Sequence, residues 1–261
     1  MKRLIGEDKV LSDEIDLLCY SFDSSFMAKL NRFLPDVVVT PLSTEDVMKV
    51  VGYAYEHEIP IIPRGAGTGE TCGAVALGGG IVMDLSLWDN IIEIDAANMQ
   101  ALMRPGVIHA KLNERLARFG LFFPPDPGST RMCTIGGMVA NNASGLKAVK
   151  YGSTEQYVLG LDVVLPTGEL ITTGGVGART VKNVSGLNLT KLFVGSEGIL
   201  GIITMIRLKV LPKPKGRGIV MAAFSDLDHA PATVLRVYRQ GILPACIEIL
   251  DSSAITAVNT Y

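Results

Sequence analysis

The sequence predicts an α+β fold made of two successive subdomains. The first supporting observation is a β-α-β-loop-β order between residues 34 and 95. The second is a change at about residue 96, where longer alternating strands replace the short strand–helix alternation. The third is glycine, which supplies 28 of the 261 residues and gathers between Gly65 and Gly201. Such crowding indicates places where the backbone must approach another backbone or a ligand.

The first subdomain follows from its strand and helix signals in order. Residues 36–41 (DVVVTP) are rich in valine and predict a strand. Ser43 or Thr44 is a suitable cap for the helix that follows, and acidic residues in its first turn favour the positive end of the helix dipole. Residues 59–63 and 80–86 predict the remaining strands.

The second subdomain is predicted over residues 96–212. A strand at 100–106 precedes a helix at about 109–119, and the glycine after that helix suits its carboxyl end. Residues 158–174 predict a hairpin that turns at Pro-Thr-Gly, and residues 201–212 predict a long alternating strand.

Both ends of the chain differ from this central part. Residues 1–33 predict a helical segment, and PKPKGRG at 212–218 predicts a linker. Beyond the linker we expect strands at 219–224 and 245–250, a helix at about 228–240 and a second helix opened by Asp251 or Ser252. A β-α-β-α unit of this size cannot cover its own apolar face. Residues 213–261 are therefore expected to be the truncated start of a further domain, or to be completed by a partner.

Bulk composition excludes several classes of function. The net charge of -2 offers no general attraction to nucleic acid or to an anionic membrane. No apolar run approaches the roughly 18–20 residues of a membrane helix. The N-terminus is acidic where a signal peptide needs its apolar centre. We expect a cytoplasmic protein that meets a membrane only through a partner.

The cysteines and histidines are widely scattered. Without a CxxC pair, a disulfide or a metal site is not expected, and the four cysteines are predicted to be buried, reduced thiols. They are Cys19, Cys72, Cys133 and Cys246. His57 lies in a charged stretch and His109 on a predicted helix, so both are expected at the surface.

The stretch PRGAGTGE, which starts at Pro63, places three alternating glycines directly after a strand. Either it is a tight bend, or its amides form a cradle for an anion with Arg64 as a charge partner. A Rossmann G-x-G-x-x-G turn is excluded, because its third glycine would fall on Glu70 or Cys72. Two further loops, 124–152 and 192–204, are equally rich in turn residues, and one extended ligand explains all three most economically.

At these loops the sequence resembles the FAD-linked oxidases with a VAO/PCMH-type FAD-binding domain, in the branch that holds the D-type subunit of glycolate oxidase and D-lactate dehydrogenase. The motifs are PRGAGTG, PPDPGS…TIGGMVANNASG and VKNVSGLNLTKLFVGSEGILGIIT, in a match from about residue 34 to residue 212. The resemblance implies FAD extended between two subdomains (34–95 and 96–212). It also implies that residues 213–261 begin a ferredoxin-like cap domain.

The resemblance also implies which residues bind FAD. The glycine loop would hold the diphosphate, and the residues from 126 to 137 would lie along the cofactor. The residues from 142 to 145 would line the same crevice near the flavin, and the last loop would approach the adenosine half. In that order they are Pro63, Arg64, Gly65, Ala66, Gly67, Thr68 and Gly69; Asp126, Gly128, Ser129, Thr134, Gly136, Gly137, Asn142, Ser144 and Gly145; and Glu197, Gly198, Ile202 and Ile203.

Two of these assignments leave an alternative open. Ile202 and Ile203 equally fit the inward positions of an alternating strand. Thr68 stands where relatives with covalent flavin often carry histidine, so non-covalent FAD is expected. Cys133 is the alternative nucleophile, although a packed thiol is the simpler interpretation.

The implied activity is oxidation of a D-2-hydroxy acid such as glycolate or D-lactate by hydride transfer to the flavin. No catalytic residue is assigned, because in the family the base and the substrate-binding cations come mostly from the cap domain and the chain after it. The electron acceptor stays open among a quinone, a cytochrome, an electron-transfer flavoprotein and an iron–sulfur protein. The alternatives are a non-catalytic FAD-binding subunit or fragment that needs a partner or the missing C-terminal part, and a nucleotide-binding protein without flavin.

Overall fold

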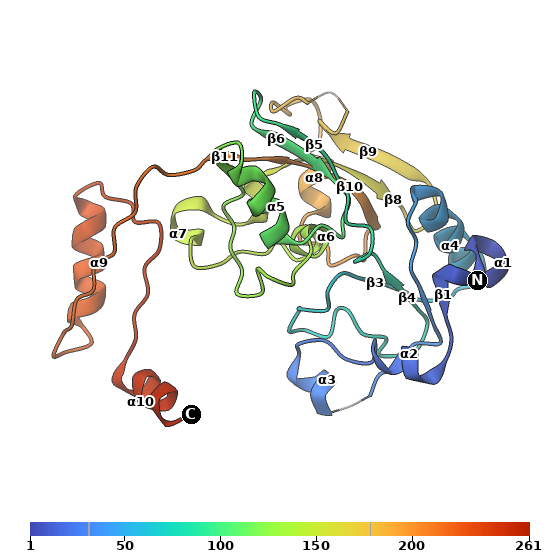
Figure 1. The fold of residues 1–261 in the computed structure, drawn as a ribbon, viewed down its shortest axis with the longest axis horizontal. Helices are drawn as coiled ribbons and strands as arrows, with labels where there is room; N and C mark the ends of the chain where they lie inside the picture. Colours follow the sequence, from blue (N-terminus) through green and yellow to red (C-terminus); the bar gives the residue numbers. More distant parts are fainter. Residues whose placement is uncertain (31, 178) are drawn as a thin grey trace.

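Two sheets organise the protein (Figure 1). The computed structural model describes residues 1–30, 32–177 and 179–261. The first sheet has the strand order β1-β2-β4-β3 and the second β5-β6-β10-β8-β9, and β11 pairs with β7 in a small third sheet. Because β5 pairs with β6, the change of sheet falls between β4 and β5, ahead of the boundary expected near residue 95.

The strands are β1 Val10–Leu11, β2 Val37–Val39, β3 Ile61–Arg64, β4 Ile81–Asp84, β5 Ile91–Asp95, β6 Gln100–Met103, β7 Leu121–Phe122, β8 Val158–Val164, β9 Leu170–Gly174, β10 Ile202–Lys209 and β11 Leu211–Pro212. The α-helices are α1 Lys2–Ile5, α2 Glu14–Leu18, α3 Phe26–Leu30, α4 Thr44–Glu56, α5 His109–Ala117, α6 Ile135–Ala140, α7 Ala148–Tyr151, α8 Leu189–Phe193, α9 His229–Arg239 and α10 Ser252–Thr260. Two short 3-10 helices span Glu7–Lys9 and Thr154–Gln156.

The first sheet carries parallel β2, β4 and β3 and an antiparallel edge strand, β1. The predicted cap of α4 is confirmed, since the Ser43 hydroxyl accepts a hydrogen bond from the Asp46 amide at 3.1 Å. Strand β1 was not expected, because two residues are too short for a periodic pattern to show. It brings the N-terminal segment, expected to be helical, onto the sheet.

Helix α4 joins the two sheets. Its apolar face packs into one cluster with the inner residues of the first sheet and with Val164 and Ile202 of the second. Figure 1 shows this helix beside β8 and β9. The other face of the first sheet is covered by the N-terminal segment, with Val38 and Val82 packed against Leu17 and Tyr20. Both faces of the first sheet are therefore covered by elements that are distant in sequence.

The second sheet is antiparallel throughout. The predicted hairpin is confirmed as β8 and β9, with the Leu165 amide donating to the Glu169 carbonyl across the turn at 2.8 Å. The long strand predicted at 201–212 is interrupted at Val210, whose amide donates a hydrogen bond to the Met99 carbonyl. Strand β11 follows directly after it. One face of the sheet buries the largest core, to which α5, α6 and α8 contribute.

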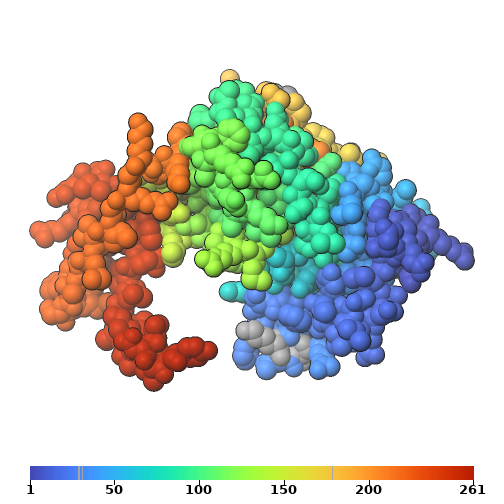
Figure 2. Space-filling model, viewed as in Figure 1, coloured from blue at the N-terminus to red at the C-terminus, as the bar shows by residue number. Residues whose placement is uncertain are grey.

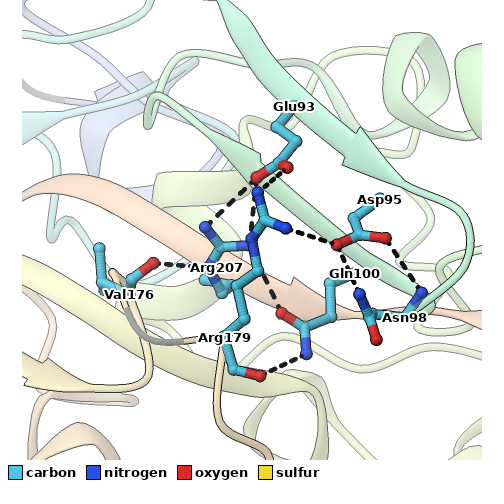
Figure 3. A network of polar contacts seen from close by, with 7 residues as sticks. All are labelled: Glu93, Asp95, Asn98, Gln100, Val176, Arg179 and Arg207. Atoms are coloured by element: carbon cyan, nitrogen blue, oxygen red, sulfur yellow. Dashed lines mark hydrogen bonds and ion pairs between the residues drawn. The ribbon is translucent and has the colours of Figure 1, made fainter.

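Arg207 anchors a polar network on the opposite face (Figure 3). Its neighbours Ile206 and Leu208 both enter the main core, so its own side chain leaves the sheet on the other side. It is 3% exposed and donates to the Val176 carbonyl at 2.6 Å and toward Glu93 at 3.4 Å. Arg179 contacts Glu93 and donates to Asp95 at 3.2 Å, so the chain after β9 is fastened to β5.

The C-terminal segment, residues 213–261, stands off from this body (Figure 2). Helices α9 and α10 form where expected, and the Asp251 carboxylate caps α10. The strands expected at 219–224 and 245–250 are wrong, because neither stretch has a neighbouring strand to complete its backbone hydrogen bonds. Ile219 is 95% exposed, and neither helix contains a buried residue.

The four cysteines are all free thiols, but the expectation that all are buried is wrong. Only Cys133 is buried; Cys72 is intermediate, and Cys19 and Cys246 are exposed. Cys19 follows the short helix α2 and Cys246 lies in the C-terminal segment, where too little structure surrounds a side chain to cover it. Over the described residues, no helix is both long and apolar enough to cross a membrane.

Candidate FAD-binding site

A cleft of about 530 Å³ opens at the carboxyl end of β3. One wall is the glycine loop, which we define as residues 65–74, and the other is formed by the loops around α6 and before β10. Sixteen of the twenty expected cofactor residues line it. They are Pro63, Arg64, Gly65, Ala66, Gly67, Thr68, Gly69, Gly128, Ser129, Thr134, Gly136, Gly137, Ser144, Glu197, Gly198 and Ile203. The three loops singled out in the sequence therefore meet in one place.

Asp126 and Gly145 are expected cofactor residues that brace the wall from behind. The Asp126 carboxylate accepts from the Lys147 amide at 3.1 Å and pairs with its ammonium group at 2.8 Å. A β-carbon at Gly145 would collide with the Asp126 carbonyl oxygen. Glycine is needed there because two backbones touch, so the residues keep the wall's shape without lining it.

Asn142 and Ile202 also lie outside the lining. The Asn142 side chain accepts from the Glu155 amide at 2.9 Å, and its backbone has a φ of 48°. Ile202 is buried in the cluster that joins the two sheets, next to Val164. For Ile202 the structure follows the alternative left open above, an inward position on a strand.

Thirteen lining residues lie outside the expected set of cofactor residues, and one of them, Cys133, was considered above only as an alternative nucleophile. They are Glu70, Thr71, Gly73, Ala74, Leu85, Pro105, Pro127, Cys133, Met138, Ala140, Asn141, Ala143 and Gly201. Most of them directly continue the expected motifs, and extending each motif by a few residues would have included them. Leu85 and Pro105 follow β4 and β6, which only the packing of the sheets brings to the cleft.

The glycine loop presents its amides without internal partners. Among the hydrogen bonds of residues 1–30, 32–177 and 179–261, no main-chain amide from Gly65 to Ala74 acts as a donor. A run of unpaired amides beside a cleft suits a ligand rich in anionic oxygens. The loop therefore fits the diphosphate of a dinucleotide such as FAD.

Two glycines in the cleft are required by close approach. Gly67 has a φ of 64°, and a β-carbon there would fall 2.8 Å from the guanidinium carbon of Arg64. Gly198 has a φ of 82°, and its β-carbon would collide with the Pro63 ring. Both positions combine a left-handed backbone with no room for a side chain.

Arg64 supports the glycine loop from beneath. It is 8% exposed, donates to the Ala74 carbonyl at 2.8 Å and stacks on the Tyr20 ring, 5.4 Å from its centroid. Asp84 is its register partner on β4, so the two side chains share one face of the sheet. Burial lowers the Arg64 pKa, while the carboxylates of Asp84 and Asp23 oppose that shift. The sequence predicted that the Arg64 guanidinium would be a charge partner for a bound diphosphate. In the structure this group points mainly into the protein.

Helix α6 begins at the opposite wall with its own amides satisfied. Thr134 caps it by accepting from the Gly137 amide at 3.2 Å. The Ile135 and Gly136 amides donate to the Val107 and Pro105 carbonyls, at 2.7 and 2.8 Å. This end of the helix is occupied by packing onto the turn after β6, whereas the glycine loop offers an unbroken run of free donors.

Cys133 lines the cleft as a buried thiol. Burial raises its pKa above the ordinary value for cysteine. Because the thiolate is the nucleophile, this environment disfavours covalent attachment to a flavin.

His109 is buried, which makes the expectation of a surface residue wrong. It is 3% exposed at the start of α5, where it contacts the Thr130 hydroxyl through Nδ1. Its Nε2 lies 3.0 Å from the Asn113 amide nitrogen. Asn113 uses its oxygen to accept from the Phe123 amide at 2.8 Å, so its nitrogen is the donor to His109. Nε2 is therefore an acceptor, and the ring is neutral with its proton on Nδ1.

This geometry predicts a stability change with pH. Burial lowers the pKa of His109 below its usual 6.5, with Asp126 acting against that shift and Lys147 adding to it. As the pH falls, the unfolded chain protonates His109 before the folded chain does. The contribution of His109 to the free energy of unfolding is therefore constant above about pH 6.5, and stability falls as the pH drops below that value. We expect His109→Gln to flatten the slope by up to about 1.4 kcal/mol per pH unit in urea melts from pH 7.5 to 5. His57→Gln, at the exposed end of α4, controls for loss of an imidazole; equal slopes in wild type and His109→Gln would contradict the assignment.

A second hollow of about 850 Å³ lies between β5 and α5. None of the expected cofactor residues lines it, and the glycine loop does not reach it. The geometry of the anion cradle therefore singles out the smaller cleft as the candidate site.

Comparison with known proteins agrees with this geometry. The FAD binding domain family matches residues 35–174, a stretch that begins before β2 and ends with β9. The chain is 39% identical to "Glycolate oxidase subunit GlcD" of Bacillus subtilis over 94% of this chain and 51% of that protein. It is 37% identical to "D-lactate dehydrogenase" of Anaerostipes hadrus over 97% of this chain and 52% of that protein.

Solved structures show the same fold. A structure of alkyldihydroxyacetonephosphate synthase superposes with a TM-score of 0.78 at 25% identity, over 94% of this chain and 49% of that chain. The chain spans about half the length of the curated relatives that it matches. Because the family match covers more than half of the residues and includes the glycine loop and most of the cleft lining, this chain belongs to the FAD binding domain family.

Proposed function

We propose that this chain is the FAD-binding part of an oxidoreductase that oxidises a D-2-hydroxy acid such as glycolate or D-lactate. The observation that carries the proposal is the run of unpaired amides in residues 65–74, set in a cleft whose three loops are those of the family motifs. The relatives named for glycolate oxidation and D-lactate dehydrogenation support the substrate class. When bound, FAD would supply the flavin that accepts a hydride from the substrate.

The residues of this chain would bind and orient the cofactor. The glycine loop would hold the diphosphate, and the residues around Gly128 would lie along the cofactor. Ser144 would line the crevice near the flavin, and Glu197 with Ile203 would lie near the adenosine half. Thr68 offers no imidazole for a histidyl link, and the raised pKa of Cys133 disfavours a thioether. Bound FAD is therefore proposed to be non-covalent.

A second candidate is an FAD-binding subunit or fragment that needs further polypeptide for catalysis. The lining favours it, because the described residues of the cleft include no histidine, and its one cationic side chain, Arg64, is directed into the protein. A hydroxyl proton needs a base and a substrate carboxylate needs cations. In this form of the proposal a partner or a longer chain supplies both.

The first test is an absorbance spectrum of the purified 261-residue chain before and after acid precipitation. A flavin spectrum with FAD released into the supernatant is expected. Colour that stays in the pellet would contradict the non-covalent assignment, and a colourless chain that fails to take up added FAD would contradict the function itself.

Turnover then separates the two forms of the proposal. Dye reduction is measured with glycolate and D-lactate, with L-lactate as the control for stereochemistry. Turnover by this chain alone favours the complete enzyme, whereas FAD binding without turnover favours the part that needs a partner or a longer chain.

A further inference from the structure

The back of the glycine loop is held by a turn from the N-terminal segment, residues 23–25. The Ser24 amide donates to two loop carbonyls, those of Gly67 at 3.2 Å and Gly69 at 3.1 Å. The side chain of Ser24 is exposed, so its contribution to this contact comes from the backbone. These bonds fix two peptide units of the loop from the side away from the cleft.

The direction of those carbonyls sets the direction of two amides. In a trans peptide unit the C=O and the following N–H point in opposite directions. The carbonyls of Gly67 and Gly69 point toward Ser24, so the amides of Thr68 and Glu70 point away from it. Both residues line the cleft, and neither amide has a partner among the described residues. The turn therefore holds two of the cradle's donors in place.

The turn itself is anchored independently of the loop backbone. The Asp23 carboxylate accepts from the Ser25 amide at 2.9 Å, and Asp23 is 5% exposed. The Ser25 hydroxyl accepts from the Ala28 amide at 3.2 Å and lies 2.9 Å from the Cys72 sulfur. These contacts give Ser24 a fixed position from which to act on the loop.

We propose that the 23–25 turn is the positioning element of the FAD site, with the Ser24 amide orienting the Thr68 and Glu70 amides toward a diphosphate. This inference rests on the proposed binding of FAD and adds residues outside the matched part of the chain, which begins at residue 35. It assigns the N-terminal segment a direct effect on cofactor affinity, in addition to covering the first sheet.

The test compares two substitutions at one position. Ser24→Pro removes the amide hydrogen, whereas Ser24→Ala keeps it and removes the exposed hydroxyl. The full chain, stripped of flavin, is titrated with FAD, ADP and AMP by calorimetry, and its melting temperature is measured without ligand. We expect Ser24→Pro to weaken FAD and ADP roughly tenfold while AMP, which lacks the second phosphate, changes much less. Ser24→Ala is expected to bind all three like the wild type.

Each outcome decides a separate point. Wild-type chain that binds no FAD overturns the proposed function. If the wild-type chain binds FAD and the Ser24→Pro chain binds FAD and ADP with the same affinity as the wild type, only the role of the turn is overturned. An equal loss of affinity for ADP and AMP also overturns the role of the turn, because a general disturbance of the fold would weaken both ligands whether or not they carry a second phosphate. If Ser24→Pro does not fold, an amide-to-ester change at residue 24 removes the same hydrogen without the proline ring and is interpreted in the same way.

Discussion

A Gly67→Val chain is expected to lose its FAD while keeping its fold. Valine at a φ of 64° is strained, and its β-carbon would fall 2.8 Å from the guanidinium carbon of Arg64. The loop must shift to make room, which moves the amides that form the cradle. We expect FAD affinity to fall at least ~100-fold, the equivalent of about 2.7 kcal/mol, as measured by flavin content after purification and by titration of the stripped chain.

Gly120→Val is the matched control for that experiment. Gly120 has a similar φ of 67°, with no atom near the place of a β-carbon, and it follows α5 away from the cleft. Both substitutions carry the backbone strain of about 1–2 kcal/mol, so both are expected to lower the melting temperature by a few degrees. Only Gly67→Val is expected to lose FAD. Full flavin content in Gly67→Val would contradict the assignment of the glycine loop.

Arg64→Met is expected to reduce the free energy of unfolding by about 3–5 kcal/mol. The substitution keeps an apolar stem but removes a buried guanidinium beside the carboxylates of Asp84 and Asp23, which are themselves buried. It also removes the donor to the Ala74 carbonyl, and with it the support beneath Gly67. We therefore expect a large loss of stability in urea melts of the chain without ligand, and weaker FAD binding as a consequence.

Arg104→Met is the matched control for this second experiment. Arg104 also stacks on an aromatic ring, that of Trp88, and donates to a backbone carbonyl, that of Thr204 at 3.1 Å. It is less deeply buried, so we expect a loss of about 1 kcal/mol. If Arg64→Met proves as stable as the control yet binds no FAD, direct contact between Arg64 and the diphosphate replaces the supporting role described here.

Local signals in the sequence predicted most of the central fold and the C-terminal helices. The cap at Ser43, the hairpin of β8 and β9 and the start of α10 at Asp251 depend on neighbouring residues, and each formed where its pattern indicated. The strands expected at 219–224 and 245–250 did not form, because a strand depends on residues that are distant in the sequence. A strand needs hydrogen bonds from another strand, and no local pattern supplies that partner.

The same division explains the candidate site. Glycine spacing and loop composition predicted the three loops, because glycine is the residue type that lets the backbone approach a ligand or another backbone closely. The inward direction of Arg64 and the burial of His109 depend on what packs against them, namely Asp84 and Tyr20 in one case and Asn113 and Thr130 in the other. These partners come from other elements, so only the assembled core could identify them.

The sequence by itself determined the family, the position of the glycine loop and the residue types of an anion cradle, since these depend on short-range chemistry along the chain. The tertiary structure decided which amides are free and what holds them there. Ser24 reaches Gly67 and Gly69 because β1, together with the packing of Leu17 and Tyr20, brings the N-terminal segment onto the first sheet. Residues so far apart in the sequence meet only when whole sheets pack together. Burial of the core offsets the entropy lost in closing such long loops, and no local signal in the sequence supplies that free energy.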